Sequence, residues 1–201
     1  MTHACESDLG DLLTEIRACT LCAAHLPLGP RPIVVANPEA KLLIIGQAPG
    51  TKVHETGIPW NDPSGDRLRD WLGVDREIFY GHPGIAIMPM GFCYPGRAKS
   101  GGDSPPRPEC APAWHAKLKA HLPNIETTML VGSYAQKAYV GPGGPKLSMT
   151  DRVRAWRDEA PGVVPTPHPS WRTNHWEKRN PWFREEAIPV LQSHVSKILR
   201  L

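Results

Sequence analysis

The segment Lys41–Gly50, KLLIIGQAPG, decides the fold class of this chain. Its four aliphatic residues, LLII, run directly into a loop of small residues and a proline. A short apolar run bounded by turn formers is typical of a strand buried on both faces of a parallel sheet. Gly46, Ala48 and Gly50 leave the loop almost bare of side chains, so its backbone N–H groups can approach a ligand closely. Because ligands of open α/β proteins bind at the carboxyl ends of strands, we expect a site here.

The same loop matches neither the dinucleotide fingerprint G-x-G-x-x-G nor the phosphate loop G-x-x-x-x-G-K-[ST]. By itself it is equally consistent with an ordinary strand-to-helix turn. Other parts of the chain have to decide between these two interpretations.

Three further apolar runs, at 85–88, 127–131 and 163–166, also have the length and composition of strands. Helical patterns lie before, between and after these runs, at 7–18, 64–72, 112–121, 133–140 and 180–201. Pro189 is expected to kink or divide the last one. Strands that alternate with helices predict a three-layer α/β/α sandwich around a mainly parallel four-stranded sheet.

The bulk composition limits the class of protein. With 201 residues, 40% of them hydrophobic and 21% charged, residues 1–201 are expected to form one globular domain. A net charge of +3 is compatible with an anionic partner but does not by itself indicate one. No apolar run approaches the ~20 residues that span a membrane, and the N-terminus MTHACESDLG is unlike a signal peptide. We therefore expect a monomer in the reducing cytoplasm, where cysteines are thiols or metal ligands.

Four of the five cysteines form a pattern. Cys19-x2-Cys22 follows the first expected helix, and Cys93 and Cys110 flank the loop 94–109, which is rich in proline and glycine. This spacing suits a tetrahedral iron or zinc centre if the fold brings the two pairs together. The alternative is a redox C-x-x-C with two unrelated buried thiols. A redox C-x-x-C normally opens a helix after a strand, whereas this one follows a helix, so the metal centre is favoured.

Two further segments carry residues suited to chemistry. His168-Pro169-Ser170 follows the last expected strand, so the histidine should face the same crevice as the Lys41–Gly50 loop and could bind an oxygen that gains negative charge. Trp60, in the loop 57–65, could stack on a planar ring. The alternatives are a histidine that caps a turn between two prolines and a tryptophan that plugs the core.

A basic and aromatic run follows at 171–184, WRTNHWEKRNPWFR. It combines four cationic residues, Arg172, Lys178, Arg179 and Arg184, with three tryptophans, a composition that favours contacts with phosphates and bases. A solvated helix start with core tryptophans is the alternative.

Taken in order, these segments resemble the uracil-DNA glycosylase superfamily, and most closely its iron–sulfur branch of the family-four type. The matching series, which spans residues 18–171, reads Cys19-x2-Cys22, IIGQAPG (44–50), GIPWNDPSGDRL (57–68), MPMGFCYPG (88–96), PECAPAW (108–114) and PTPHPSW (165–171). Each motif is weak alone, but the ordered combination is highly specific.

The resemblance implies a role for each matching residue. Gln47 and Ala48 correspond to the loop that contacts the flipped base and the deoxyribose, and Trp60 to the aromatic residue that stacks on the base. His168 corresponds to the histidine that stabilises the departing base. Ser170, Trp171 and Arg172 correspond to the loop that wedges into the duplex. From the composition of the basic run, Lys178 is expected to bind phosphate. Cys19, Cys22, Cys93 and Cys110 would hold a [4Fe–4S] cluster, with zinc as the alternative.

Two positions depart from the family pattern. Pro89 stands where an asparagine reads the edge of the base. Ala48 stands where the most active members carry an acid or an amide that holds the attacking water. Asp62 is therefore the best-placed carboxylate to orient water or to balance the cationic sugar.

Three functions follow as hypotheses. The leading one is a base-excision repair glycosylase that removes uracil or a related deaminated base from DNA. The alternative is a DNA-binding module of the same fold with little or no activity, which the residues at 48 and 89 favour. A hydrolase of small nucleosides is the third, but it leaves the basic run 171–184 unexplained.

Overall fold

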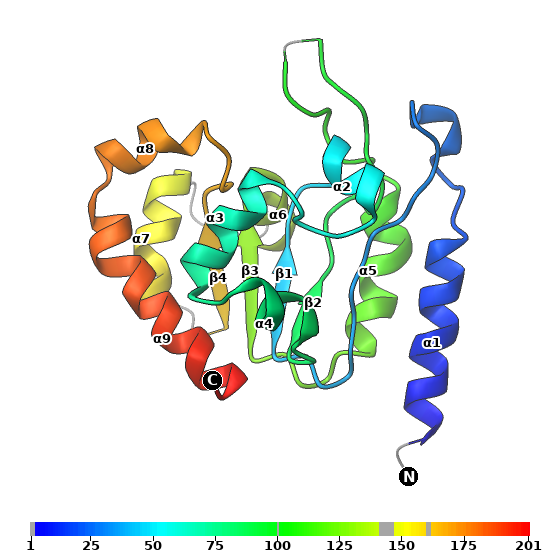
Figure 1. Cartoon of the computed structure of the whole chain (residues 1–201), viewed down its shortest axis with the longest axis horizontal. Coiled ribbons are helices and arrows are strands. Elements are labelled where there is room, and N and C mark those ends of the chain that lie inside the picture. The colour runs from blue at the N-terminus through cyan, green and yellow to red at the C-terminus, as the bar shows by residue number, and fades with distance from the viewer. Residues whose placement is uncertain (1–2, 100, 141–146, 160–161) are drawn as a thin grey trace.

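The computed structural model describes residues 3–99, 101–140, 147–159 and 162–201, and the side chains of 3–8 and 157–159 lie outside the description. Its centre is one sheet of four strands in the order β2-β1-β3-β4, every pair of which is parallel (Figure 1). The strands are β1 (Leu42–Ile45), β2 (Ile85–Ile87), β3 (Thr127–Val131) and β4 (Val163–Thr166). The α/β fold class predicted from the strand pattern is confirmed.

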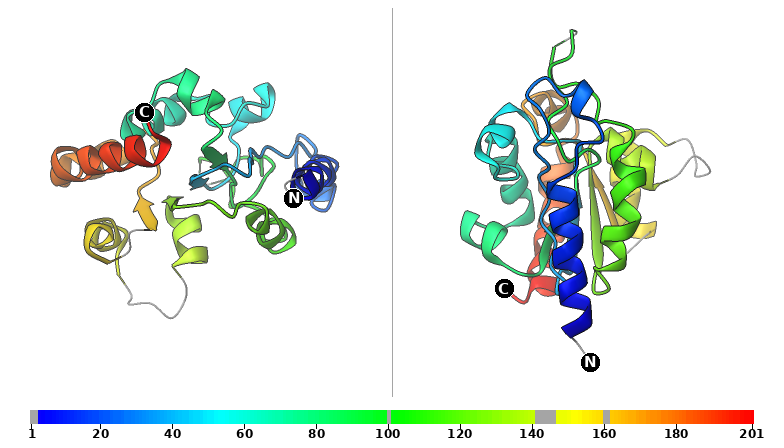
Figure 2. Two further views of the ribbon diagram at one scale, coloured as in Figure 1. Left: turned by 90° about the horizontal axis from the view of Figure 1, so that it is seen from below. Right: turned by 90° about the vertical axis from the view of Figure 1, so that its right-hand side faces the viewer.

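Helices surround the sheet on both faces (Figure 2). In chain order they are α1 (His3–Arg17), η1 (Ala23–His25), α2 (Thr51–Thr56), α3 (Pro63–Leu72), α4 (Arg76–Gly81), α5 (Cys110–Ala120), α6 (Ser133–Tyr139), α7 (Met149–Glu159), α8 (Thr173–Arg179), the π-helical turn η2 (Phe183–Ala187) and α9 (Ile188–Leu199).

Alternation along β1 divides the core into two halves. Leu42 and Ile44 pack on one face of the sheet against α3, α4 and α9. Leu43 and Ile45 pack on the other face against α1, α5 and α6. All four side chains are at most 1% exposed, as expected for a strand covered on both faces. This arrangement confirms the predicted three-layer sandwich.

Helix boundaries differ from the predicted ones at several places, among them α1, which begins at His3 instead of residue 7, and α5, which begins at Cys110 instead of residue 112. Helix α3 begins at Pro63, one residue before the predicted start, and is capped by Asp62, because Pro63 fits the first helical position, where no N–H is needed. The predicted C-terminal helix is divided just before Pro189, which lies in the first turn of α9, and a π-helical turn precedes it. The short helices α2, α4 and α8, and also α7, had no predicted counterpart.

The two edges of the sheet have different neighbours. At the carboxyl ends of the strands lie α2, the start of α3 and the long loop between β2 and α5, which projects beyond the rest of the molecule (Figure 1). The C-terminus of the chain lies at the opposite edge. In the described part of the chain, no helix combines the length and the apolar character needed to cross a membrane.

Candidate active site

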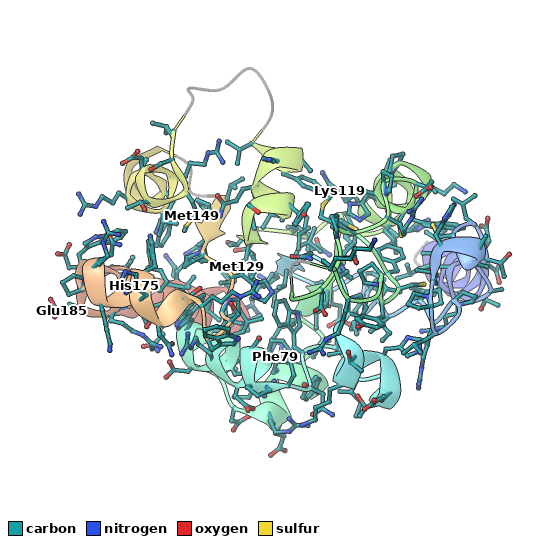
Figure 3. All side chains as sticks on the ribbon, turned by 90° about the horizontal axis from the view of Figure 1, so that it is seen from above. Phe79, Lys119, Met129, Met149, His175 and Glu185 are labelled. Carbon is teal, nitrogen blue, oxygen red and sulfur yellow. The ribbon has the colours of Figure 1, made fainter. Side chains whose placement is uncertain are left out.

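A cavity of about 520 Å³ opens at the carboxyl ends of the strands. Figure 3 looks down on this edge, with α8 (His175) and the start of α7 (Met149) on one side and α5 (Lys119) on the other. The structure brings eight of the nine residues predicted to contact base, sugar or phosphate to its wall, namely Gln47, Ala48, Trp60, Asp62, His168, Ser170, Trp171 and Arg172. Lys178 lies apart from the cavity, exposed on α8.

Trp60 and His168 face one another in this cavity. Their ring centroids are 5.8 Å apart, and the ring planes are inclined by 37°. Two glycines make room for the tryptophan, because a Cβ atom on Gly46 would lie 2.8 Å from Trp60 Cζ2, and one on Gly65 would lie 1.7 Å from the Trp60 carbonyl oxygen. Trp60 itself has a φ of 55°, in the left-handed region that residues with a side chain rarely adopt. This backbone strain at a cavity wall is typical of a functional position.

The backbone holds His168 firmly. Its carbonyl oxygen accepts hydrogen bonds from the Ser170 N–H (2.8 Å) and from the Thr173 hydroxyl. Gly132, whose φ is 82°, lies against the ring, where a Cβ atom would come within 3.3 Å of His168 Cβ. Burial lowers the pKa of His168 below its ordinary value, and the nearby negative charge of Asp62 only partly opposes this. The imidazole is therefore neutral at pH 7 and retains one N–H donor.

The two carboxylate oxygens of Asp62 have different surroundings. One carboxylate oxygen, Oδ1, accepts a hydrogen bond of 2.8 Å from the Gly65 N–H and thus caps α3. The other oxygen, Oδ2, lies 3.9 Å from the point that a Cβ atom on Gly50 would occupy. Only this second oxygen remains available to the cavity.

A buried histidine holds the part of the cavity wall that Pro89 forms. Pro89 lines the cavity, and the Pro89 carbonyl oxygen lies 3.0 Å from Nε2 of His115, a buried histidine on α5. Burial lowers the pKa of His115, and its ring stacks on Phe92 with centroids 5.7 Å apart. The sequence did not predict a role for His115, because its contact with Pro89 joins residues 26 positions apart and no local sequence pattern indicates it.

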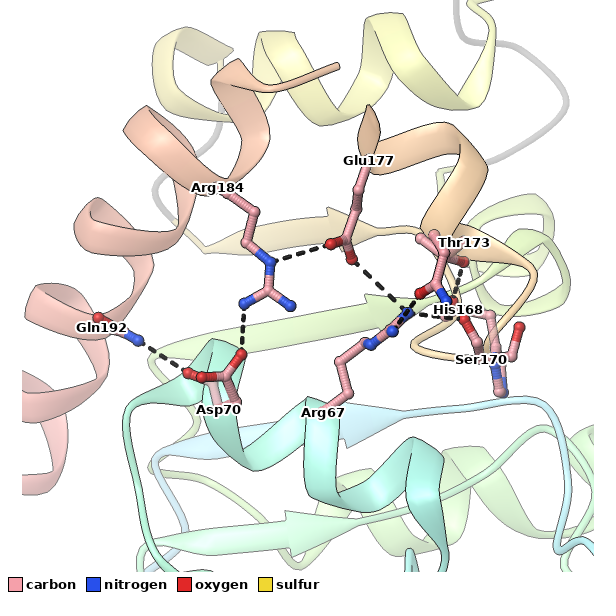
Figure 4. A network of polar contacts seen from close by, with 9 residues as sticks. Arg67, Asp70, His168, Ser170, Thr173, Glu177, Arg184 and Gln192 are labelled. Carbon is pink, nitrogen blue, oxygen red and sulfur yellow. Dashed lines mark hydrogen bonds and ion pairs between the residues drawn. The ribbon is translucent and has the colours of Figure 1, made fainter. Parts of the chain in front are cut away.

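A network of polar contacts joins α3 to the loop that follows β4 (Figure 4). Arg67 donates hydrogen bonds to the Ser170 carbonyl oxygen (2.9 Å) and to the Asn174 side chain. Farther along the network, Glu177 accepts a hydrogen bond from Arg184 Nε (3.0 Å), and Arg184 also pairs with Asp70. Arg67, likewise absent from the predicted site, therefore holds the two walls of the cavity together.

The basic run 171–184 divides into two groups. Trp171, with 75% of its surface exposed, and Arg172 lie at the mouth of the cavity, and Lys178 and Arg179 are exposed on α8. The other two tryptophans, at 176 and 182, pack against the core, and Arg184 is held by two carboxylates. The first group is therefore accessible to a DNA strand, whereas the second group packs against the protein, although Trp176 also lines the cavity.

The four cysteines of the predicted pattern come together. Cys19, Cys22, Cys93 and Cys110 line one small cavity, together with apolar side chains that include Leu26, Phe92 and Trp114. All four are free thiols. Burial raises the pKa of Cys93 to about 11 and that of Cys110 to about 12. Among the described residues, no group of three or more His, Cys, Asp or Glu side chains is arranged to hold a metal ion.

Residues 33–192 match the family model described as the Uracil DNA glycosylase superfamily. This segment includes the whole sheet, the walls of the cavity and the second pair of cysteines. The chain therefore belongs to this superfamily, and its class is that of a DNA glycosylase, a hydrolase of N-glycosidic bonds.

A curated relative narrows the placement. The Type-4 uracil-DNA glycosylase of Thermotoga maritima is 26% identical to this chain over 171 residues, which cover 82% of the chain and 83% of the relative. The family match and this relative together confirm the predicted superfamily and its family-four branch.

Proposed function

We propose that this DNA glycosylase hydrolyses the bond between deoxyribose and uracil, or a related deaminated base, in DNA. One observation carries the proposal, namely that Trp60 and His168 face one another 5.8 Å apart in a cavity at the strand ends. An extruded pyrimidine ring could stack on the tryptophan while the histidine reaches one of its carbonyl oxygens.

Each step of the reaction has residues suited to it. The base leaves the stack at a cost of a few kcal/mol, which is lowest for a mispaired base. As the glycosidic bond breaks, the bonding electrons leave with the base and negative charge collects on its carbonyl oxygen. The neutral imidazole of His168 donates a hydrogen bond to this oxygen, and Gln47 and Ala48 line the sugar side of the bond.

The mouth of the cavity suits a DNA strand. Trp171 and Arg172 project beside the opening, where an aromatic ring can fill the space of a departed base and a guanidinium can bind phosphate. Lys178, on the adjoining helix α8, extends the basic surface. These contacts favour DNA over a free nucleoside as substrate.

We also infer that the four cysteines hold a [4Fe–4S] cluster. Four free thiols around one apolar cavity, two of them buried and two half-buried, are the donor set that such a cluster requires. The cluster would tie the segment 19–22 to α5.

A direct assay tests the proposed activity. Single-stranded and mispaired oligonucleotides, each with one uracil or other deaminated base, are incubated with the protein and then cleaved at abasic sites with alkali. We expect cleavage at uracil. Binding without cleavage of any substrate would favour a DNA-binding module instead, with Ala48 and Pro89 as its cause.

The cofactor is tested separately. Anaerobically purified protein should be brown and contain about four iron atoms per chain. A colourless protein with stoichiometric zinc would contradict the cluster but retain the site. The cytoplasmic location, the single domain and the monomeric state stay predictions.

A further inference from the structure

Two carboxylates line the cavity, those of Asp62 and Asp103. Asp103 lies outside every motif of the sequence, in the long loop between Cys93 and Cys110. Its carboxylate is a candidate for holding the water that attacks the sugar. With alanine at position 48, the one polar side chain left in the Gly46–Gly50 loop is that of Gln47, and its Nε2 is already bound to the Ser104 carbonyl oxygen.

Backbone hydrogen bonds fix the position of Asp103. The Ser104 N–H donates to the Gly96 carbonyl oxygen (2.8 Å), and the Ala98 N–H donates to that of Gly102 (3.0 Å). Arg97 and Asp103 are paired as an antiparallel bridge between these two bonds. The segments 96–98 and 102–104 therefore pair as the two arms of a hairpin, and Asp103 occupies a defined place on the second arm.

The hairpin is also attached to the catalytic loop. Nε2 of Gln47 donates a hydrogen bond of 3.1 Å to the Ser104 carbonyl oxygen. As a result, Asp103 Oδ2 lies 3.5 Å from the point that a Cβ atom on Gly50 would occupy, and Asp62 Oδ2 lies 3.9 Å from the same point. The two carboxylates thus flank Gly50, two positions after Ala48.

The two carboxylates are not equivalent. Asp62 uses one oxygen to cap α3, whereas neither oxygen of Asp103 accepts a hydrogen bond from a described residue. Asp103 is exposed at the mouth of the cavity, yet partial desolvation there and the negative charge of Asp62 raise its pKa, and the cations of Arg97 and Arg172 oppose the rise. A raised pKa makes the carboxylate of Asp103 a better proton acceptor than an ordinary aspartate.

We infer that Asp103 is the catalytic residue that orients the attacking water and accepts its proton. The inference rests on the proposed glycosylase function. The water oxygen forms a bond to C1′ of the deoxyribose as the bond from C1′ to the base nitrogen breaks. The electron pair of that bond leaves with the base, the water proton passes to Asp103, and the base anion later takes a proton from solvent.

The test compares single-turnover excision of uracil from duplex DNA by the wild type and by Asp103→Asn. The amide keeps the size of the side chain but cannot accept the proton, so the rate should fall about 10²- to 10⁴-fold. The acidic limb of the pH–rate profile should disappear as well. Affinity for DNA should not decrease, because the change removes a negative charge beside the phosphates.

Two further variants make the result specific. Glu55→Gln removes one exposed charge from neighbouring α2 without touching the cavity and should keep the wild-type rate. Asp103→Glu retains a carboxylate and should recover part of the activity. An Asp103→Asn rate within about threefold of wild type, or an unchanged acidic limb, overturns the inference while the glycosylase function stands. A wild type that cleaves no substrate overturns both.

Discussion

Arg67 Nη1 lies 2.9 Å from the carbonyl oxygen of Ser170 and donates a hydrogen bond to it. This contact joins α3, whose N-terminal end follows Trp60, to the loop that carries His168 and Trp171 (Figure 4). One guanidinium thereby fixes the relative position of the stacking residue on one wall and of the hydrogen-bond donor on the other.

Replacement of Arg67 by methionine should therefore impair duplex substrates selectively. The loop at 170–172 matters most where a base must be forced out of a stack, and a single strand needs no such work. We expect the single-turnover rate to fall about tenfold on duplex DNA, the equivalent of ~1.4 kcal/mol, and much less on single-stranded DNA. Arg184→Met, which disrupts the same network away from the loop, is the matched control. Equal losses on both substrates would mean that Arg67 only stabilises the fold.

His168→Ala should slow the chemical step. A preorganised donor to a developing negative charge typically contributes ~3–4 kcal/mol, or about 10²- to 10³-fold in rate. Single-turnover cleavage should fall by that factor while the affinity for DNA stays nearly constant, because phosphate contacts dominate affinity. An active enzyme that is indifferent to this change would falsify the assigned role of His168.

Gly46→Ala should act through Trp60. The added methyl group would lie 2.8 Å from Trp60 Cζ2, so the ring must move. We expect weaker binding of DNA that contains a non-hydrolysable deoxyuridine analogue, in the same direction as Trp60→Ala, whose cost should be ~1–3 kcal/mol. Gly81→Ala is the control, since a Cβ atom there meets no atom within 4 Å. Unchanged affinity of Gly46→Ala for the analogue would argue against stacking on Trp60.

Salt dependence should separate the two groups of the basic run. Arg172→Ala and Lys178→Ala should each reduce the slope of log affinity against log salt concentration by about one. Arg184→Ala should leave that slope unchanged, because its guanidinium is held by Asp70 and Glu177. The opposite ranking in a titration of binding between low and high salt would place the DNA on a different face.

Stability should depend on the protonation of His168. Burial lowers its pKa below the ordinary 6.5, so the unfolded chain takes up a proton at a higher pH than the folded protein does. The contribution of His168 is therefore complete above pH 6.5 and is lost as the pH falls through the folded-state pKa. His168→Gln should flatten the decline of the unfolding free energy between pH 7 and 5. The decline should not vanish, because burial lowers the pKa of His115 in the same direction.

The sequence predicted the elements whose residues are buried in a regular pattern, above all the strands. A run such as LLII contains no polar residue that would have to face solvent, so the sequence itself predicts a strand buried on both faces. All four strands were located to within one residue. The helices α2 and α4 escaped prediction because six residues offer too few positions to establish a period.

The predicted site residues come from the ends of strands, where topology alone brings them together. Asp103, His115 and Arg67 could not be found in this way. Their positions depend on a hairpin that folds back and on contacts between residues up to 107 positions apart.

The opposed edges of the sheet have a practical consequence. Since the C-terminus lies at the edge away from the cavity, a tether added after Leu201 would leave the DNA-facing edge directed outward. The protein could then be fixed to a solid support, or joined to a second DNA-binding protein, without obstruction of the substrate's approach.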